Sequence, residues 1–330
     1  MNNHSNIRIG VVGLGYLGKF HLDKYLKIKN GVKVTALSDI SEDTLENFRK
    51  IPDTKRVTDY REILGDVDAV SIVTPTCTHY EIAKFFLENG KDVLLEKPMT
   101  STVEEANRLV EISEKNGNIF QIGHLERFNP AVMACKEYID KPMFIECLRI
   151  SPYIGRSTDT DVIRDLMIHD IDIILSIVKS RIKNIHAVGV PILTDKIDIS
   201  NARLIFDSGC VVNITSSRVS FKKERKIRIF QDNRYISINY EKKSIRVYTL
   251  NKGNRQVIKP TDFLTCFKMK RLKFSHNIDQ LQLEIDAFVN CVKNRITPEV
   301  SALEGRNALE AALKILSNVE VNLDDTLCRS

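Results

Sequence analysis

Residues 7–22 read IRIGVVGLGYLGKFHL and place three glycines, spaced G-x-G-x-x-G, after a short apolar run. The run has the composition of a buried strand, and the residues behind the last glycine continue as a helix. At such a junction Gly13 permits a tight turn, Gly15 lets a ligand approach the backbone, and Gly18 brings the helix close to the strand. The free N–H groups and the dipole of a helix start attract a diphosphate. The stretch therefore predicts a dinucleotide-binding turn, with cofactor contacts at Gly13, Gly15, Tyr16, Leu17 and Gly18.

The second expected strand ends in VTALSDI, residues 34–40, where Asp39 follows Gly18 by about twenty residues. A carboxylate at this point can accept both ribose hydroxyls of NAD and repels the 2′-phosphate of NADP. Ile40, the next residue, offers no cation for that phosphate. The predicted cofactor is therefore NAD.

A second loop at a strand end reads VTPTCTHYEIA, residues 73–83. Loops at the carboxyl ends of parallel strands touch the cofactor, so Thr74 and Pro75 are candidate contacts. His79 has two readings that the sequence leaves open. It is either a ligand contact or a histidine held for structural reasons at a helix start.

The first 120 residues alternate short β-branched runs with amphipathic stretches. The expected strands are 7–12, 32–37, 69–73, 92–95 and 119–122. The expected helices are 17–28, 43–50, 79–89 and 102–116. Such alternation predicts a parallel sheet with helices on both faces, which is the Rossmann architecture.

The pattern changes near residue 123, after which β-rich segments dominate. They are 182–190, 200–206, 210–218, 225–231, 234–239, 243–249 and 254–259, and two amphipathic helices at 277–294 and 303–318 close the chain. We therefore predict an α/β protein of two domains. Residues 1–123 form the Rossmann dinucleotide-binding domain, and 124–330 form an α+β domain with a large, mostly antiparallel sheet. The closing helices can pack back toward the first domain.

The composition excludes several other classes of protein. With 43% hydrophobic and 28% charged residues the chain can build cores, and it has no apolar run long enough to cross a bilayer. Seven scattered cysteines without a CxxC pair argue against disulfides and a metal site, and the start shows no secretory signal, so we expect a cytoplasmic protein. The net charge is +6, but the basic clusters 221–228 and 268–274 match no nucleic-acid motif. We expect them on a sheet edge and a loop, with no nucleic-acid or membrane partner.

Residues 161–172, DVIRDLMIHDID, pose a problem of burial. In an α-helix Asp161, Asp165, His169 and Asp172 fall within an arc of about 80°, while most of the remaining helix surface is apolar. A helix apolar on most sides is buried, and buried carboxylates are costly unless a partner compensates them. This polar stripe must therefore face something polar.

A third strand end carries LLEKPMTSTVEEA, residues 94–106. Glu96, Lys97 and Pro98 resemble the EKP signature of the Gfo/Idh/MocA oxidoreductase family. The resemblance extends over essentially the whole chain, through the glycine turn, the TP…H loop, the helix with Asp165 and His169, and the closing stretch 296–315.

This resemblance implies NAD-dependent oxidation of a secondary alcohol on a sugar or cyclitol. Lys97 would contact both cofactor and substrate and stabilise the charge on the reacting oxygen, while Glu96 would border the cofactor. His169 would remove the hydroxyl proton, and Asp165 would orient the imidazole or the substrate. The polar stripe would then face the substrate, although the roles of Asp161 and Asp172 stay open. No metal is implied.

One departure narrows the substrate. Many family members have glycines before the aspartate of this helix, whereas this chain has Ile163 and Arg164. Together with GHLERFNPAV, residues 123–132, this resembles the branch that acts on nucleotide sugars. It implies a UDP-N-acetylhexosamine oxidised at C3 and an aminotransferase that takes the 3-keto sugar into lipid A biosynthesis. Candidate substrate contacts are Arg127, Asn129 and Arg156, each with a surface or structural role as the alternative.

Two other functions stay open at this stage. The same site could oxidise an inositol or a free sugar, or the chain could be an NAD-binding regulator without catalysis, although such a regulator would be expected to lose Lys97 or His169. By family analogy the protein is a homodimer or homotetramer whose second-domain sheets pack face to face. If so, strands 200–206 and 210–218 should be apolar on both faces, a condition that CVVNITSS, residues 210–217, satisfies only in part.

Overall fold

The structure, a computed structural model of the chain, describes residues 6–153, 155, 160–250, 266–275 and 277–327, with side chains up to residue 319. The chain divides into two compact units. The first runs to Phe128 and includes Asp279–Leu309, and the second comprises Asn129–Ile278 and the residues from Glu310 onward. The predicted boundary between residues 123 and 124 lies five residues before Phe128.

The first unit contains a sheet of six parallel strands in the order β3-β2-β1-β4-β5-β6. The strands are β1 Ile7–Val12, β2 Val32–Ser38, β3 Lys55–Val57, β4 Ala69–Ile72, β5 Asp92–Glu96 and β6 Phe120–Gly123. Its helices are α1 Tyr16–Lys27, α2 Glu42–Glu46, α3 Thr76–Glu88, α4 Val103–Asn116 and α7 Gln280–Asn294. This strand order is that of a Rossmann fold and confirms the prediction.

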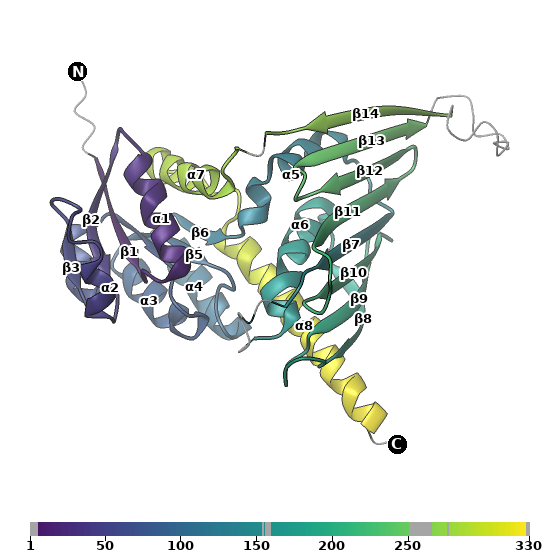
Figure 1. Cartoon of the computed structure of the whole chain (residues 1–330), viewed down its shortest axis with the longest axis horizontal. Coiled ribbons are helices and arrows are strands. Elements are labelled where there is room, and N and C mark those ends of the chain that lie inside the picture. The colour runs from purple at the N-terminus through teal and green to yellow at the C-terminus, as the bar shows by residue number, and fades with distance from the viewer. Residues whose placement is uncertain (1–5, 154, 156–159, 251–265, 276, 328–330) are drawn as a thin grey trace. The chain divides into compact units, whose positions relative to one another are not determined.

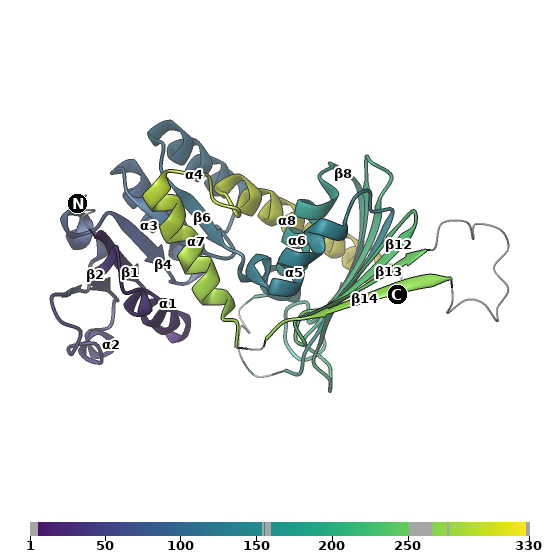
Figure 2. The same cartoon turned by 90° about the horizontal axis from the view of Figure 1, so that it is seen from above.

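Helices cover both faces of this sheet, as Figures 1 and 2 show. Helices α1 and α7 lie on one face, where Leu22 and Tyr25 of α1 pack with Ile285 and Phe288 of α7 in one apolar cluster. Helices α3 and α4 lie on the other face. The strand order reverses between β1 and β4, and ligands of such sheets bind beyond the carboxyl ends of the strands at this point.

The second unit contains a sheet of eight strands in the order β14-β13-β12-β11-β7-β10-β9-β8. The strands are β7 Phe144–Ile150, β8 Ile182–Val190, β9 Ile199–Phe206, β10 Val211–Ser217, β11 Glu224–Gln231, β12 Arg234–Asn239, β13 Ser244–Leu250 and β14 Phe267–Lys273. Only the pair β7 and β10 is parallel among the described pairs of this sheet. The sheet is therefore mostly antiparallel, as predicted.

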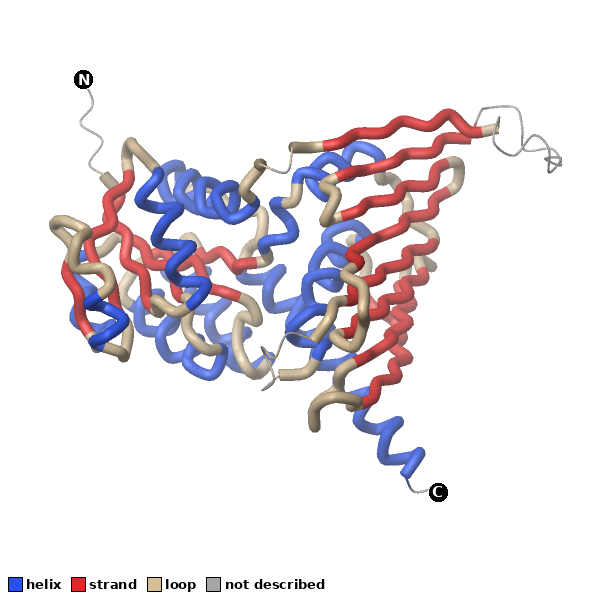
Figure 3. The backbone as a smooth tube through the Cα atoms, viewed as in Figure 1, coloured by secondary structure: helices blue, strands red, loops and turns tan. Residues whose placement is uncertain are grey.

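One face of this sheet carries α5 Pro130–Cys135, α6 Ile168–Val178 and the later part of α8 Ala302–Leu327, while the other face has no helix over it in Figure 3. Burial alternates along the strands, so that Ile145, Cys147 and Arg149 of β7 point to the helix side. Among the described helices, none is both long and apolar enough to cross a lipid bilayer.

Three strands were missed by the sequence prediction, and each has a physical reason. Strand β3 has three residues, too few for a visible pattern, and β7 carries an arginine on its buried face. Strand β14 is an edge strand with lysines on both faces, a composition that discourages edge-to-edge pairing. The basic cluster 268–274 thus forms this edge, whereas 221–228 leads into the interior strand β11. The strand expected at 254–259 lies outside the described residues.

Candidate active site

The glycine turn has the geometry that a diphosphate site requires. Gly13 adopts φ +88°, and a Cβ on it would lie 2.5 Å from the Val73 carbonyl oxygen. A Cβ on Gly18 would lie 1.9 Å from the Gly13 carbonyl oxygen, so only glycine lets α1 start this close to β1. Around Gly15, in contrast, a Cβ would meet no atom within 4 Å, and no side chain caps this end of α1. The open space and the uncapped helix start fit a bound diphosphate.

Asp39 ties the ends of the first two strands together. Its carboxylate accepts hydrogen bonds from the backbone N–H of Leu14 at 2.7 Å and of Ser41 at 3.0 Å. Each carboxylate oxygen keeps a further lone pair for a ribose hydroxyl. The adjacent Ile40 is 94% exposed and brings no positive charge. The residues present therefore suit NAD.

His79 connects two loops at the carboxyl edge of the sheet. Its Nδ1 lies 2.9 Å from the Pro98 carbonyl oxygen and its Nε2 lies 2.9 Å from the Thr74 carbonyl oxygen. The ring is buried, and burial lowers the pKa of His79 despite these two carbonyl groups. Pro75 starts α3 as its N-terminal cap residue. The geometry gives His79 a structural role in holding the Thr74 and Pro98 loops together.

Glu96 and Lys97 stand at the carboxyl end of β5, one strand away from the point between β1 and β4 where the strand order reverses. The Glu96 side chain is buried and folds back so that one of its carboxylate oxygens accepts the Lys97 backbone N–H at 3.2 Å. Its other oxygen lies 3.1 Å from His21 Nε2. Lys97 itself is half-buried. The sequence prediction did not include His21, although a polar residue on the inward face of α1 was a signal for a buried partner.

The stretch around Asp165 is not one uniform α-helix. The prediction that Asp161, Asp165, His169 and Asp172 fall within an arc of about 80° assumed such a helix and is therefore wrong. Ile163–Met167 form a π-helical segment that runs into α6. A π-helical segment turns less per residue than an α-helix, so the angles calculated for an α-helix do not hold across it. Such segments occur often at functional sites. Asp165 and His169 are both half-buried, Asp165 inside the segment and His169 one residue into α6.

Asp161 and Asp172 are buried rather than part of an open stripe. Asp161 accepts the backbone N–H groups of Ile163 at 3.0 Å and Arg164 at 2.9 Å, and its second oxygen pairs with the Arg164 side chain at 2.5 Å. It therefore caps the helix start, where the helix dipole also favours a carboxylate.

Asp170, beside His169, anchors α6 to the sheet. Arg149 of β7 donates to both Asp170 oxygens, at 2.7 Å and 2.9 Å, and the two side chains are 2% and 1% exposed. The Arg149 guanidinium also stacks over Tyr240, 5.3 Å from the ring centre. The sequence prediction missed this pair. One sequence feature could have indicated the pair: Arg149 alternates with the apolar residues Ile145 and Cys147, as a residue on the buried face of a strand does. A buried arginine needs a carboxylate partner.

Two of the three candidate substrate residues make hydrogen bonds or ion pairs with other parts of the protein. Arg127 is buried and donates to Glu304 at 2.9 Å, and Asn129 is buried, caps α5 through Ala131 and donates to the Tyr240 carbonyl oxygen at 3.3 Å. These contacts give each residue a structural partner within its own unit. Arg156 lies outside the described residues.

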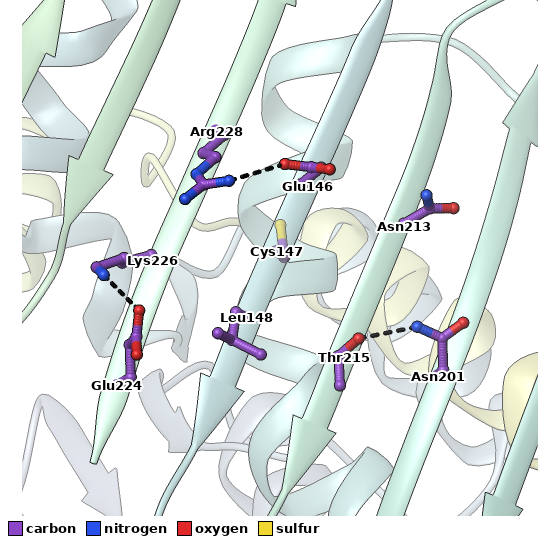
Figure 4. A pocket seen from close by; sticks show the side chains of 9 residues that line it. All are labelled: Glu146, Cys147, Leu148, Asn201, Asn213, Thr215, Glu224, Lys226 and Arg228. Atoms are coloured by element: carbon purple, nitrogen blue, oxygen red, sulfur yellow. Dashed lines mark hydrogen bonds and ion pairs between the residues drawn. The ribbon is translucent and has the colours of Figure 1, made fainter. Parts of the chain in front are cut away.

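A shallow pocket of about 350 Å³ lies on the face of the large sheet opposite α6. Figure 4 shows its side chains on β7, β9, β10 and β11, with Arg228 and Glu146 3.4 Å apart and Asn201 donating to Thr215 at 2.8 Å. It is open and contains no residue of the predicted site. The expectation that both faces of β9 and β10 are apolar is wrong, because their outward residues include Asn201, Asn213 and Thr215.

Comparison with known proteins points to one family. The sequence pattern of the Gfo/Idh/MocA group, described as an oxidoreductase family with an NAD-binding Rossmann fold, matches residues 7–124. The UDP-N-acetylglucosamine 3-dehydrogenase of Acidithiobacillus ferrooxidans is 33% identical over 322 residues, covering 96% of this chain and 99% of the relative. The NAD⁺-dependent scyllo-inositol 2-dehydrogenase of Bacillus subtilis is 28% identical and covers 93% of this chain and 92% of its own.

Solved structures agree. A structure of the Acidithiobacillus ferrooxidans enzyme superposes with a TM-score of 0.87 at 32% identity, over 96% of this chain and 98% of the other. The scyllo-inositol dehydrogenase of Lactobacillus casei, with bound NAD(H) and scyllo-inositol, superposes with a TM-score of 0.78 at 22% identity, over 96% and 98%. At that identity the second likeness shows a shared fold.

Proposed function

The chain belongs to the Gfo/Idh/MocA family of NAD-dependent oxidoreductases, and from this we propose that it oxidises the C3 hydroxyl of a UDP-N-acetylhexosamine. It is a dehydrogenase acting on alcohol groups with NAD as cofactor. The observation that carries the finer proposal is the 33% identity, over nearly the full length of both chains, to a UDP-N-acetylglucosamine 3-dehydrogenase.

We propose that Lys97, Asp165 and His169 act on the same substrate hydroxyl. NAD, when bound, accepts the hydride that leaves the carbon. His169 takes the hydroxyl proton, so that the C–O single bond becomes a carbonyl while the C–H electron pair leaves. Lys97 donates to the reacting oxygen and stabilises its negative charge. Asp165 orients the imidazole or a neighbouring hydroxyl of the substrate.

The inositol dehydrogenases supply a second candidate of the same class. The Bacillus subtilis scyllo-inositol enzyme matches over 93% of this chain, and a cyclitol offers the same secondary alcohol without a nucleotide. A non-catalytic regulator is the less favoured proposal because Lys97, Asp165 and His169 are all present.

The product of C3 oxidation is a ketone, which is the kind of carbonyl that an aminotransferase converts to an amine. We propose that such an enzyme consumes it, in the formation of an amide-linked lipid A. We also propose a cytoplasmic location, since the described cysteines are all free thiols.

We propose that the chain forms a homodimer or homotetramer through the β11–β13 part of the sheet face that no helix covers in Figure 3, since the outward residues of β9 and β10 are polar. An aromatic row crosses this face, in which Phe230 stacks on Tyr235 at 4.8 Å and Tyr235 on Tyr248 at 5.2 Å. Light scattering gives the mass in solution. Tyr235→Asp should lower that mass to the monomer, and an unchanged mass would exclude this face as the interface.

The test of the activity is the NADH absorbance after mixing protein, NAD and UDP-N-acetylglucosamine, with and without a 3-aminotransferase and glutamate. A rise that grows with the coupling enzyme supports nucleotide-sugar oxidation. A signal only with myo-inositol or scyllo-inositol supports the second candidate. No signal with any alcohol, while NAD binds, supports the regulator.

Two variants assign the roles. Lys97→Ala and His169→Ala should each lower kcat by at least about 100-fold and leave the Kd of NAD within about twofold. Matched controls are Lys115→Ala in the last turn of α4 and His186→Ala on β8, which are exposed and should act as wild type. Wild-type turnover in either of the first two would remove that residue from the mechanism.

A further inference from the structure

A buried line of polar groups leads through the first unit to the backbone of Lys97. The Tyr25 hydroxyl lies 2.8 Å from Ser71 Oγ, and Ser71 Oγ lies 3.4 Å from His21 Nδ1. His21 Nε2 lies 3.1 Å from one oxygen of Glu96, whose other oxygen accepts the Lys97 N–H at 3.2 Å. His21 and Ser71 are fully buried, and Tyr25 and Glu96 nearly so.

The chemistry of these groups gives the line a direction. Burial opposes the charge on Glu96, but the hydrogen bond from His21, the positive charges nearby and the Lys97 backbone N–H together outweigh it, so the pKa of Glu96 lies below its ordinary value. An ionised carboxylate only accepts, so the shared proton is assigned to His21 Nε2. In the neutral ring Nδ1 then accepts from Ser71, which in turn accepts from Tyr25. Burial raises the pKa of Tyr25, which keeps it a donor.

The fold also reserves room for the Glu96 carboxylate. Gly123 of β6 pairs in register with Glu96, and a Cβ on Gly123 would lie 3.0 Å from Glu96 Oε1. A side chain there would press on the oxygen that faces His21. The carboxylate is therefore confined between His21, the Lys97 N–H and Gly123.

We propose that His21 is a positioning residue for Lys97 and acts through Glu96. His21 holds the Glu96 carboxylate in place, and the carboxylate in turn holds the backbone N–H of Lys97. The backbone of Lys97 therefore keeps one conformation, which limits the directions that its side chain can take. This inference rests on the proposed role of Lys97. Because a misplacement of about 1 Å can cost a reaction about 100-fold, loss of the contact should lower kcat by about 10- to 100-fold. Substrate and NAD affinities should change little.

The experiment compares two substitutions of the same residue. In His21→Gln the longer amide brings an N–H donor toward Glu96. In His21→Asn the shorter amide stays near Ser71 and is too short to reach Glu96. The measurements are the hydrogen exchange rate of the Lys97 amide, kcat and KM for UDP-N-acetylglucosamine or the inositol that is turned over, and the Kd of NAD.

Leu109→Ala supplies the stability control. Leu109 is fully buried in α4 of the same unit and belongs to none of the contacts above, so its truncation should lower Tm without changing Lys97 exchange or kcat. If His21→Asn does not fold, Ser71→Ala replaces it. That variant keeps the imidazole, removes its hydroxyl partner and should act in the same direction more weakly.

The inference is supported if His21→Asn speeds Lys97 exchange and lowers kcat 10- to 100-fold while His21→Gln stays near wild type. It is overturned if Lys97 exchange is unchanged in His21→Asn, or if kcat merely follows Tm across all variants. Absence of wild-type turnover on every alcohol would refute the proposed function instead. The hydrogen exchange rate of the Lys97 amide would then still show whether His21 holds the backbone at Lys97.

Discussion

Breaking the Arg149–Asp170 pair on one side should be far more damaging than removing both partners. Arg149→Met leaves a carboxylate that is 1% exposed in the structure, and Asp170→Leu leaves a guanidinium that is 2% exposed. An uncompensated buried charge costs about 3–5 kcal/mol of unfolding free energy. Each single variant should lose this much.

The double variant Arg149→Met/Asp170→Leu removes both charges and fills their space with apolar groups of similar size. Replacement of a buried pair in this way is commonly neutral or stabilising. If the two single effects were additive, the double variant would lose about 6–10 kcal/mol. We expect it to lie within about 2 kcal/mol of wild type, so the coupling energy should be at least about 4 kcal/mol.

Urea unfolding followed by circular dichroism measures these differences, since the chain has no tryptophan for fluorescence. Activity provides a second readout because Asp170 adjoins His169 on α6. The single variants should lose kcat as well as stability. Single losses below about 1 kcal/mol, or a double loss equal to their sum, would refute the view that this pair is buried and mutually dependent.

Three further predictions concern the turn, the cofactor and pH. Gly15→Ala should fold normally but bind NAD more weakly, whereas Gly18→Ala should lower Tm, because only the latter Cβ meets backbone, at 1.9 Å; equal Tm values would contradict this. Asp39→Ala should narrow the preference for NAD over NADP in binding assays, and an unchanged ratio would show that another residue reads the ribose. Burial opposes the charge of Asp198, but three backbone N–H groups and Arg218 outweigh it and hold the pKa of Asp198 well below its ordinary value of 3.8. Its stabilising effect is therefore complete above about pH 4 and is lost as pH falls further. The stability gap between wild type and Asp198→Asn should shrink in urea titrations below pH 4, and a constant gap would exclude this carboxylate as its source.

The first unit was predictable because its signals are local. Glycines, aspartates and prolines at Gly13, Asp39, Pro75 and Pro98 mark strand ends, and their spacing follows the βαβ repeat. The same residues at strand ends also predict the candidate cofactor contacts, since these contacts lie where strands end.

What escaped prediction depends on contacts between distant segments. Strand β7 was missed because Arg149 makes this stretch look polar. Its carboxylate partner Asp170 lies 21 residues further along the chain, so the sequence around β7 does not show that the arginine is buried in an ion pair. His21 and Glu96 are 75 residues apart, so neither pattern pointed to the other. The π-helical segment Ile163–Met167 has no clear sequence signal, since it differs from an α-helix in hydrogen-bond spacing rather than in composition.

A one-codon insertion or deletion within most helices turns every later side chain by about 100°. A π-helical turn holds one residue more than the α-helical turn that it replaces. Loss of one residue from Ile163–Met167 would therefore give an α-helical turn, while the cap at Asp161 before it and the anchor at Asp170 behind it keep their directions. The side chains inside the segment, Asp165 among them, would change direction. If Asp165 acts on the substrate as proposed above, the number of residues in this turn sets how Asp165 meets the substrate without rebuilding the helix.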